Sequence, residues 1–351
     1  MQLEEYVEKA KKSGLFTAPI LEQDLSRFLK EKAKVIQSLA RELYSKGLKH
    51  VFWIGSGNSW CNLYLGKYLL DRFTDIPSDY FTSYEPIWRQ LLRLNQDSVA
   101  IFASYSGNTE DTVESLRYAK KRGAKTIAIV NKEDSLMGKE ADYVIPFNST
   151  GLYVLPLATA YLFSLEIAKM EGKPVEGIIE ELFSVPQILG KAYRDDEARA
   201  RELATKYKDE DMFYVLSSGP LYGLGYKFAV TVFMENIRVN GSFIETSEFR
   251  HGPVEMLDRK KPVMVFLKGT DESREMTDRV IDLVKTVNEK VIVYDYADYG
   301  HLHPLLSPFA LMVPLQWFAV YSALLRGITD LDKRVFMGHG KMARGQGVTW
   351  P

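Results

Sequence analysis

Short apolar runs alternate with longer amphipathic stretches along most of the chain. Several runs end at glycine, serine or asparagine, and most precede a segment whose apolar positions recur with the 3.6-residue period of a helix. Apolar runs bounded in this way are typical of parallel strands that helices cover on both faces. The pattern therefore indicates an α/β fold built on parallel sheets. The predicted strands are 50–54, 98–103, 126–130, 143–146, 212–216, 262–267 and 291–294, and the predicted helices are 21–48, 60–73, 110–122, 151–170, 221–237 and 272–287.

The strand and helix pattern occurs twice. The clearest repeat is the apolar stretch Val154–Phe163, which returns as Met312–Tyr321 with its Pro-Leu pair in register. Two unrelated α/β domains could look alike because the same physics shapes both, but the shared proline register favours duplication of one βαβ domain. The predicted boundaries are a helical segment at 1–30, a first domain at 31–175, a connector at 176–208, a second domain at 209–329 and a tail at 330–351.

The helix predicted at 21–48 has the strongest amphipathic pattern of the N-terminal region. Its apolar stripe fits a period of 3.6 residues, so one side of the helix should be buried. The residues of that stripe are Phe28, Val35, Leu39 and Leu43.

Composition gives no sign of a nucleic-acid or membrane partner, or of a disulfide framework. Lys plus Arg total 45 and Asp plus Glu total 46, so no positive excess favours nucleic acid or an anionic membrane. Cys61 is the single cysteine, which excludes a disulfide framework and indicates a reducing cytoplasm. The N-terminus has no apolar signal core, and the apolar runs 154–170 and 304–325 are interrupted by Glu166 or by prolines. Both runs are therefore predicted to be buried helices rather than membrane spans.

The loop at 104–109 is rich in hydrogen-bond donors. It follows a predicted strand and precedes a predicted helix, the place where parallel α/β sheets bind ligands. The helix start adds oriented N–H groups and a positive dipole end, and the glycine lets the backbone approach a ligand closely. We therefore predict a site for a phosphomonoester. Its candidate ligands are Ser104, Ser106, Gly107, Thr109 and, from the loop after the first strand, Ser59.

Serine and threonine are also preferred at helix N-caps, so a single hydroxyl here could have only a capping role. Three hydroxyls with a glycine favour phosphate binding instead. The corresponding loop of the second copy, 268–272, has one hydroxyl among charged residues, which indicates that the copies have diverged. A dinucleotide site at Gly55–Trp60 is rejected, because tryptophan stands where the third glycine of that fingerprint is needed.

A carboxylate and an imidazole lie close together in the sequence of the second copy. Glu235 stands near the end of the predicted helix 221–237, and His251 follows a turn predicted at Asn240–Gly241. Such a pair suits proton transfer near neutral pH. Each residue by itself is more often structural, and periodicity does not decide whether Glu235 faces solvent or a pocket. The apolar positions of the same helix that should face the sheet are Phe228, Val232 and Phe233.

The loop 104–112, Glu235 and the segment Glu248–Pro253 together resemble the double sugar-isomerase (SIS) domain family. The resemblance covers nearly the whole chain from about residue 30. It implies two tandem SIS domains, each a flavodoxin-like parallel sheet with helices on both faces. It also implies that the serine and threonine hydroxyls bind the phosphate of a sugar phosphate, and that Glu235 and His251 are the catalytic acid and base. In this family the histidine typically comes from the partner subunit, which implies a homodimer.

Two departures from the family pattern choose among its members. The isomerase half of glucosamine-6-phosphate synthase has a catalytic lysine near its C-terminus, where Gln346–Thr349 stands here, and another three residues before the glutamate, where Val232 stands here. The synthase also has an amidotransferase domain with a nucleophilic cysteine, whereas this sequence begins with under ~50 residues of predicted helix. A site that keeps Glu235 and His251 without the lysines resembles the fructosamine-6-phosphate deglycases best.

The resemblance implies cleavage of a fructosamine 6-phosphate to glucose 6-phosphate and a free amino acid, without a metal or redox cofactor. Alternatives are an aldose–ketose isomerase, an amino-sugar-phosphate deaminase, and a non-catalytic sugar-phosphate sensor. A sensor usually carries a DNA-binding segment, and residues 1–49 have no basic patch suited to that role. The glycine-rich tail either frays or, as we expect, closes over the site. Further candidate substrate contacts are Gly57, Asn58, Tyr84, Glu85 and Lys341.

Overall fold

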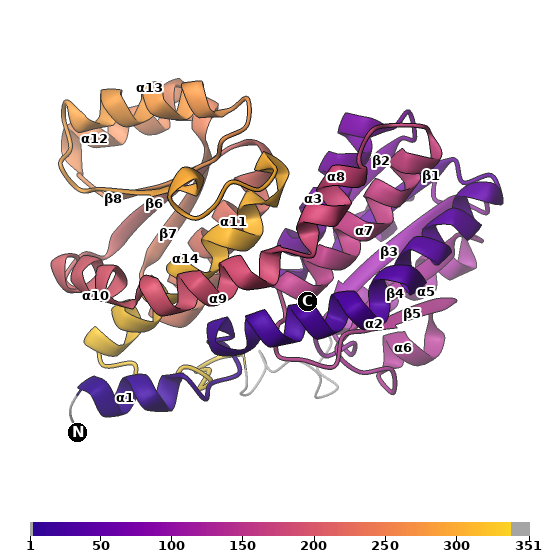
Figure 1. The fold of residues 1–351 in the computed structure, drawn as a ribbon, viewed down its shortest axis with the longest axis horizontal. Helices are drawn as coiled ribbons and strands as arrows, with labels where there is room; N and C mark the ends of the chain where they lie inside the picture. The colour runs from indigo at the N-terminus through magenta and orange to yellow at the C-terminus, as the bar shows by residue number, and fades with distance from the viewer. Residues whose placement is uncertain (1–2, 338–351) are drawn as a thin grey trace. The chain divides into compact units, whose positions relative to one another are not determined.

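The computed structural model describes residues 3–337 of the 351-residue chain. These residues form two compact units (Figure 1). One contains residues 24–180 and 333–337, and the other contains residues 3–23 and 181–332; we call them the 24–180 unit and the 181–332 unit. Each has its own parallel sheet with helices packed against it. The α/β class predicted from the sequence is therefore confirmed.

The 24–180 unit is built on a five-stranded sheet. Its strands are β1 (His50–Gly55), β2 (Ser78–Thr82), β3 (Ser98–Ser104), β4 (Lys125–Val130) and β5 (Tyr143–Pro146). All pairs are parallel and the order is β2-β1-β3-β4-β5, the flavodoxin-like order that the SIS resemblance implies. The order reverses between β1 and β3, so the carboxyl ends of these two strands flank the usual ligand position of such a sheet.

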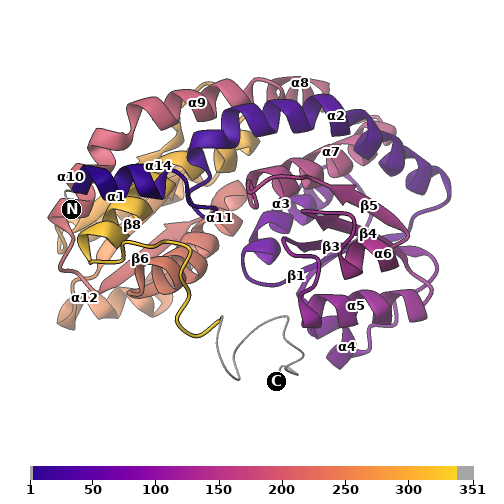
Figure 2. The ribbon, with the colours of Figure 1, turned by 90° about the horizontal axis from the view of Figure 1, so that it is seen from below.

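Helices cover both faces of this sheet (Figure 2). The helices are α2 (Ala18–Ser45), α3 (Asn58–Phe73), α4 (Glu85–Arg89), α5 (Glu110–Lys121), α6 (Leu136–Glu140), α7 (Val154–Met170) and α8 (Glu176–Leu182). On one face Trp53 of β1 packs closely against Gly66 of α3 and meets Phe163 of α7 edge-on. On the other face Phe52 and Phe102 form a core cluster with side chains of α5. Because neighbouring strand residues are buried on opposite faces, the strand sequences are apolar throughout.

The buried side of α2 differs slightly from the predicted stripe. Phe28, Leu39 and Leu43 are buried, as predicted. Val35, however, is 54% exposed, and the next residue, Ile36, is fully buried instead. At about 100° per residue the buried side is centred near Ile36 and Leu43, and Val35 falls beyond its edge. The expectation that Val35 belongs to the stripe was therefore wrong by about one position.

The 181–332 unit repeats the same topology with four strands. They are β6 (Met212–Ser217), β7 (Asn240–Glu245), β8 (Val263–Lys268) and β9 (Val291–Asp295). All pairs are parallel in the order β7-β6-β8-β9, which matches the order of the first four strands of the other sheet. The shared topology supports duplication of one βαβ domain.

β7 corrects the turn predicted at Asn240–Gly241, because both residues lie in the strand. Asn-Gly is a strong turn signal, but this glycine has a packing role instead. A Cβ atom on Gly241 would lie 2.1 Å from the carbonyl oxygen of Ala229 and 2.8 Å from the Cβ of Phe233. Glycine is therefore needed where the preceding helix lies directly against the strand.

Several helices and short 3₁₀ segments complete the 181–332 unit. The helices are α1 (Leu3–Ala10), α9 (Val185–Asp195), α10 (Glu197–Lys206), α11 (Tyr222–Tyr226), the π-helix η2 (Lys227–Ile237), α12 (Met256–Arg259), α13 (Arg274–Lys285) and α14 (Ser307–Leu325). The 3₁₀ segments are η1 (Gly219–Leu221), η3 (Thr246–His251), η4 (Pro253–Glu255), η5 (Tyr296–Asp298) and η6 (Pro304–Leu306). The stretch interpreted as a polar connector, 176–208, thus consists mainly of α8, α9 and α10.

The core of the 181–332 unit lies around α14. By length and composition the stretch Pro304–Leu325 could cross a membrane, but 89% of its apolar window is buried inside the protein. Phe318 of α14 meets Phe213 of β6 and Phe233 of η2, which stack on each other with ring centroids 4.7 Å apart. α14 is therefore the interior helix of a folded unit, as α7 is in the other unit.

Candidate functional site

The predicted phosphate loop lies at the reversal of strand order in the 24–180 unit. β3 ends at Ser104, and α5 begins at Glu110. β1 is the neighbour of β3, so the loop that follows Gly55 opens at the same edge of the sheet. The residues between β3 and α5 therefore combine strand-end loops with a helix start, as phosphate sites in open α/β sheets do.

The three hydroxyls of this loop lie together. The hydroxyl of Thr109 is 2.9 Å from that of Ser104 and 3.4 Å from that of Ser106. Thr109 occupies the N-cap position of α5, yet its side chain makes no capping hydrogen bond. Ser104 is buried and its hydroxyl accepts a hydrogen bond from the backbone N–H of Gly107, while Ser106 is exposed. Helix capping does not account for this arrangement, which gathers donors around one point.

Gly107 is required by the shape of the loop for two reasons. Its φ of 63° lies in the left-handed region, which favours glycine. A Cβ atom at this position would also lie 2.2 Å from the hydroxyl oxygen of Ser135. The carbonyl of Gly107 accepts a hydrogen bond from the N–H of Met137, so the loop is held against the start of α6. These contacts fix the backbone that carries the three hydroxyls.

Ser59 lies in the first turn of α3, after the neighbouring strand β1. Its side chain is half-buried and makes no hydrogen bond to another residue within the described range 3–337. Gly57, with a φ of 55°, precedes the helix, and the Asn58 amide donates a hydrogen bond to the carbonyl of Leu152. Of the residues predicted after β1, Asn58 therefore has a structural contact, whereas the hydroxyl of Ser59 is available to a ligand.

A network of side chains joins the loops after β1 and β2 to the first turn of α5. The Ser56 hydroxyl donates to Asp111 at 2.7 Å and lies 2.9 Å from the Ser83 hydroxyl. Ser83 is also 2.9 Å from the hydroxyl of Thr112, which donates to Asp111 at 3.1 Å. The carboxylate of Asp111 is thus engaged by neighbouring hydroxyls beside the predicted phosphate loop. Sequence reasoning did not identify this network, because its members have no shared motif.

Tyr84 and Glu85 follow β2, at the same edge of the sheet as the loops after β1 and β3. The Tyr84 ring stacks on that of Trp88, with centroids 5.2 Å apart, and Glu85 pairs with Arg89 on the next turn of α4. Partial burial, together with the nearby carboxylates of Asp111 and other α5 residues, raises the pKa of Tyr84. Lys341, the remaining predicted contact, and the segment Gln346–Thr349 lie outside the described residues.

Glu235 stands in the π-helix η2 and is half-buried. π-Helical turns are rare and are frequent at functional sites. The apolar residues predicted to face the sheet do so, since Phe228 and Phe233 are fully buried and Val232 is only 5% exposed. The helix ends at Arg238, whose φ of 63° is left-handed. The sequence predicted a helix here, but its periodicity did not indicate that the helix is a π-helix.

His251 ends the 3₁₀ segment η3 and is exposed in this chain. Its Nε2 atom accepts a hydrogen bond from Nε of Arg250 at 3.3 Å. Within the same segment the side chain of Phe249 is fully buried and belongs to the core cluster under α13. The imidazole is therefore presented to solvent by a segment that is anchored one turn earlier.

Within one chain, strand β7 lies between Glu235 and His251 in the sequence. Glu235 precedes β7, near the end of the sheet where that strand begins, and His251 follows β7. Six strand residues at about 3.3 Å each span roughly 17 Å between the two ends. The interpretation that a tight turn joins the two residues was therefore wrong, because β7 stands in place of the turn.

The equivalent loop of the 181–332 unit, 268–272, has one hydroxyl and is flanked by paired charges. Lys268 and Arg274 both contact the Asp295 carboxylate, at 3.1 Å and 2.8 Å. Burial would raise the pKa of Asp295, but hydrogen bonds from Arg274, the N–H of Ala297 and Lys268 lower it to about 2. The cations at this strand end are thus neutralised by the protein itself, which supports the prediction that the two copies have diverged.

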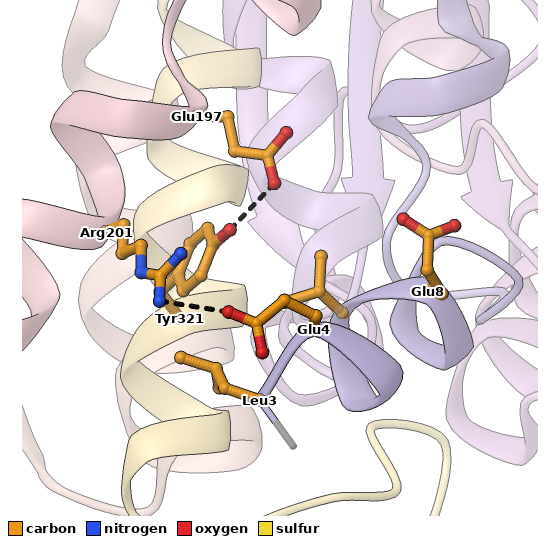
Figure 3. Close-up of a pocket in the computed structure, with 7 residues that line it drawn as sticks. Leu3, Glu4, Glu8, Glu197, Arg201 and Tyr321 are labelled. Carbon is orange, nitrogen blue, oxygen red and sulfur yellow. Dashed lines mark hydrogen bonds and ion pairs between the residues drawn. The ribbon is translucent and has the colours of Figure 1, made fainter.

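A small cavity opens elsewhere in the 181–332 unit (Figure 3). The Tyr321 hydroxyl donates to Glu197 at 2.7 Å, and Arg201 donates to Glu4 at 3.2 Å. Four of its polar side chains therefore form two pairs, and no residue predicted to bind substrate lines the cavity. The lining residues are Leu3, Glu4, Val7, Glu8, Glu197, Arg201 and Tyr321.

Residues 43–166, which contain the hydroxyl loop, match the model of the SIS domain. The chain is 30% identical over 319 residues to fructoselysine 6-phosphate deglycase of Escherichia coli strain K12, a match that covers 90% of this chain and 94% of that enzyme. The chain belongs to the SIS domain family.

Other SIS relatives agree with this assignment. The glutamine–fructose-6-phosphate aminotransferase of Thermotoga maritima is 30% identical over 319 residues, but the match covers 83% of this chain and only 52% of that enzyme. The chain also superposes on a solved structure from Bacillus subtilis that is described as a candidate phosphosugar isomerase. The TM-score is 0.79 at 28% identity, and the match covers 86% of this chain and 95% of the Bacillus subtilis chain. The SIS resemblance and the relation to the synthase inferred from the sequence are confirmed.

Proposed function

We propose that this SIS protein is an enzyme that cleaves a fructosamine 6-phosphate into glucose 6-phosphate and a free amino acid. The observation that carries the proposal is the 30% identity to a fructoselysine 6-phosphate deglycase along 94% of that enzyme. The residues Glu235 and His251 and the hydroxyl loop 104–109 supply the groups that this chemistry needs. Val232, which replaces a lysine of the synthase, is buried in the apolar side of η2.

The hydroxyl loop is the proposed phosphate site. Hydroxyls from Ser104, Ser106, Thr109 and Ser59, with N–H groups at the start of α5, would bind the phosphate oxygens. The cluster of hydroxyls at 2.9 Å and 3.4 Å supports this role, since a phosphate can take the place of their mutual hydrogen bonds. Gly107 would allow the backbone to approach the ligand. A bound phosphate would then hold the sugar in one orientation at this loop.

Ser104→Ala and Thr109→Val should each weaken binding of glucose 6-phosphate by about 10-fold or more, because each removes a hydrogen bond to a charged group. Isothermal titration calorimetry gives the dissociation constants. Ser45→Ala is the control, since Ser45 is an exposed hydroxyl of the same unit with no contact to the loop. Unchanged affinity in both loop variants would contradict the proposed phosphate site.

The proposed reaction is a reversed Amadori rearrangement. His251 would assist ring opening and act as an acid toward the carbonyl oxygen at C2. Glu235 would take a proton from C1, which gives an enaminol, and would return a proton to C2, which gives an imine between C1 and the amino acid nitrogen. Water then hydrolyses the imine and releases the amino acid and the aldehyde of glucose 6-phosphate. Each positioned proton transfer contributes on the order of 10²- to 10⁴-fold.

The two catalytic groups would come from different subunits of a homodimer. One chain has Glu235 before β7 and His251 after it, roughly 17 Å of strand apart. This separation supports a site that uses the Glu235 of one subunit with the His251 of another. The exposure of His251 in the single chain agrees with such a role, because an imidazole that serves a neighbouring subunit must lie at the surface.

The amino acid end of the substrate would lie near Tyr84 and Glu85, which follow β2 at the shared edge of the sheet. Gly57, Asn58 and Lys341 are further proposed contacts. We also place the protein in the cytoplasm, in agreement with its single cysteine and balanced charge, without nucleic acid or membrane partners.

A panel of phosphorylated Amadori compounds tests the proposed function. The panel carries lysine, small apolar and acidic amino acids on C1 of fructose 6-phosphate, and a coupled dehydrogenase assay reports glucose 6-phosphate. The proposal expects glucose 6-phosphate and free amino acid in equal amounts. Ammonia release would instead identify a deaminase, aldose–ketose interconversion without amine release would identify an isomerase, and binding without turnover would identify a sensor.

A further inference from the structure

The carboxylate of Glu245, at the end of β7, makes more hydrogen bonds than helix capping alone requires. One carboxylate oxygen accepts from the hydroxyl of Ser218. The other accepts from the N–H of Ser247 at 2.8 Å, from the hydroxyl of Ser247, and from the N–H of Glu248 at 3.3 Å. The side chain therefore joins the loop after β6 to the first residues of η3, the segment that ends at His251.

We propose that Glu245 is a positioning residue that fixes the direction in which η3 presents His251. The inference rests on the proposed function, since it assigns Glu245 no role other than through the imidazole. A glutamate is long enough to cap η3 with one oxygen and to reach Ser218 with the other. A shorter capping residue could satisfy the N–H groups but would lose the link to the loop after β6.

The charge of Glu245 strengthens this link. Burial would raise the pKa of the carboxyl group, but hydrogen bonds from Ser218, from the Ser247 hydroxyl and from the N–H groups of Ser247 and Glu248 lower it below its usual value. The group is therefore an anion at neutral pH, and hydrogen bonds to an ionised acceptor are shorter and stronger than neutral ones. A negative charge at the start of η3 also favours the N–H groups that point toward it.

A second anchor lies further along the same segment. Thr246 and Phe249 are fully buried, and Phe249 belongs to the core cluster with Leu257 and Phe266. Two contacts therefore fix the backbone that leads to His251: the hydrogen bonds of the Glu245 carboxylate and the apolar packing of Phe249. Only the side chains of Ser247, Glu248, Arg250 and His251 remain exposed in η3. Removal of the Glu245 contacts would leave Phe249 as an anchor, so the segment should stay folded but turn more freely.

Glu245→Gln tests the inference. The amide loses the charge and has only one acceptor oxygen, so it cannot hold both Ser218 and the N–H groups of η3. We expect kcat to fall between about 10-fold and 100-fold, because a displacement near 1 Å of a catalytic group has an effect of this size. The dissociation constant for glucose 6-phosphate and the thermal midpoint should stay close to those of the wild type. Glu255→Gln, at an exposed position after His251, is the matched control and should retain full activity.

Two further variants keep the test decisive if Glu245→Gln does not fold. Ser218→Ala removes only the link to the loop after β6 and should lower kcat several-fold, about 3- to 10-fold. Glu245→Asp keeps the charge and the cap and should recover part of the activity lost by the glutamine variant. Wild-type kcat in both Glu245→Gln and Ser218→Ala, beside an inactive His251→Ala, would overturn the role of Glu245 while the proposed function stands. An active His251→Ala would instead overturn the proposed function.

Discussion

Glu235→Gln should lower kcat on a fructosamine 6-phosphate at least about 100-fold, because the amide cannot take a proton from C1 or return one to C2. The affinity for glucose 6-phosphate should remain within about 3-fold of the wild type, since the hydroxyl loop in the other unit is unchanged. Steady-state kinetics on the best substrate of the panel and calorimetry with the product provide the two measurements. Loss of turnover with retained binding identifies a group that acts in the transition state.

Glu202→Gln is the control for this change, because Glu202 is an exposed glutamate on α10 of the same unit. It should leave both kcat and binding as they are. Turnover of Glu235→Gln near the wild-type rate, at a normal thermal midpoint, would show that Glu235 is a structural residue of η2. The chemistry would then need another base.

A heterodimer of Glu235→Gln and His251→Ala chains should recover about half of the wild-type activity per dimer, although each homodimer is nearly inactive. The recovery is expected because one of the two shared sites would combine the intact Glu235 of one chain with the intact His251 of the other. Two different affinity tags on co-expressed chains allow the heterodimer to be purified. Sedimentation of the wild type provides the oligomeric state on which the experiment depends.

The heterodimer experiment also has a clear negative outcome. If Glu235 and His251 act within one chain, both sites of the heterodimer lack one group and no activity returns. A monomeric wild-type enzyme would likewise show that both groups act within one chain. Either result would require η3 and η2 to approach each other around β7, against the roughly 17 Å that the strand spans.

The sequence predicted most of the fold because its strands are buried on both faces. Short apolar runs such as 98–103 and 126–130, which end at a serine or an asparagine, are typical of buried parallel strands. The observed strands β3 and β4 differ from these runs by one residue at one end. The Pro-Leu repeat indicated the duplication before the matching strand orders could be compared. Strong local patterns of this kind need no knowledge of distant contacts.

The sequence failed where a residue's role depends on what packs against it. Gly241 follows an asparagine and was therefore interpreted as part of a turn. A glycine is needed there because the carbonyl of Ala229, on the preceding helix, leaves no room for a Cβ atom. In the same way, a missing Cβ at Gly107 was attributed to ligand approach, whereas Ser135 also requires it. Packing partners such as these are remote in sequence and leave no periodic signal.

The candidate site was only partly accessible to sequence reasoning. The hydroxyl loop could be predicted because strand ends and helix starts are local features, whereas the pairing of Glu235 with His251 depended on family resemblance. The π-helical form of η2 and the fourfold hydrogen bonding of Glu245 had no signal in the sequence. Both depend on backbone geometry that several different sequences could adopt.

The fate of the hydrogens on C1 provides the most direct test of proton transfer between C1 and C2. A fructosamine 6-phosphate with two deuterons on C1 is converted by the enzyme, and the product is analysed by nuclear magnetic resonance and mass spectrometry. We expect glucose 6-phosphate with one deuteron on C1, because Glu235 removes the other before the imine forms. A ketose phosphate that keeps both deuterons on C1 would mean that the carbon–nitrogen bond is cleaved without proton abstraction, and would refute the proposed role of Glu235.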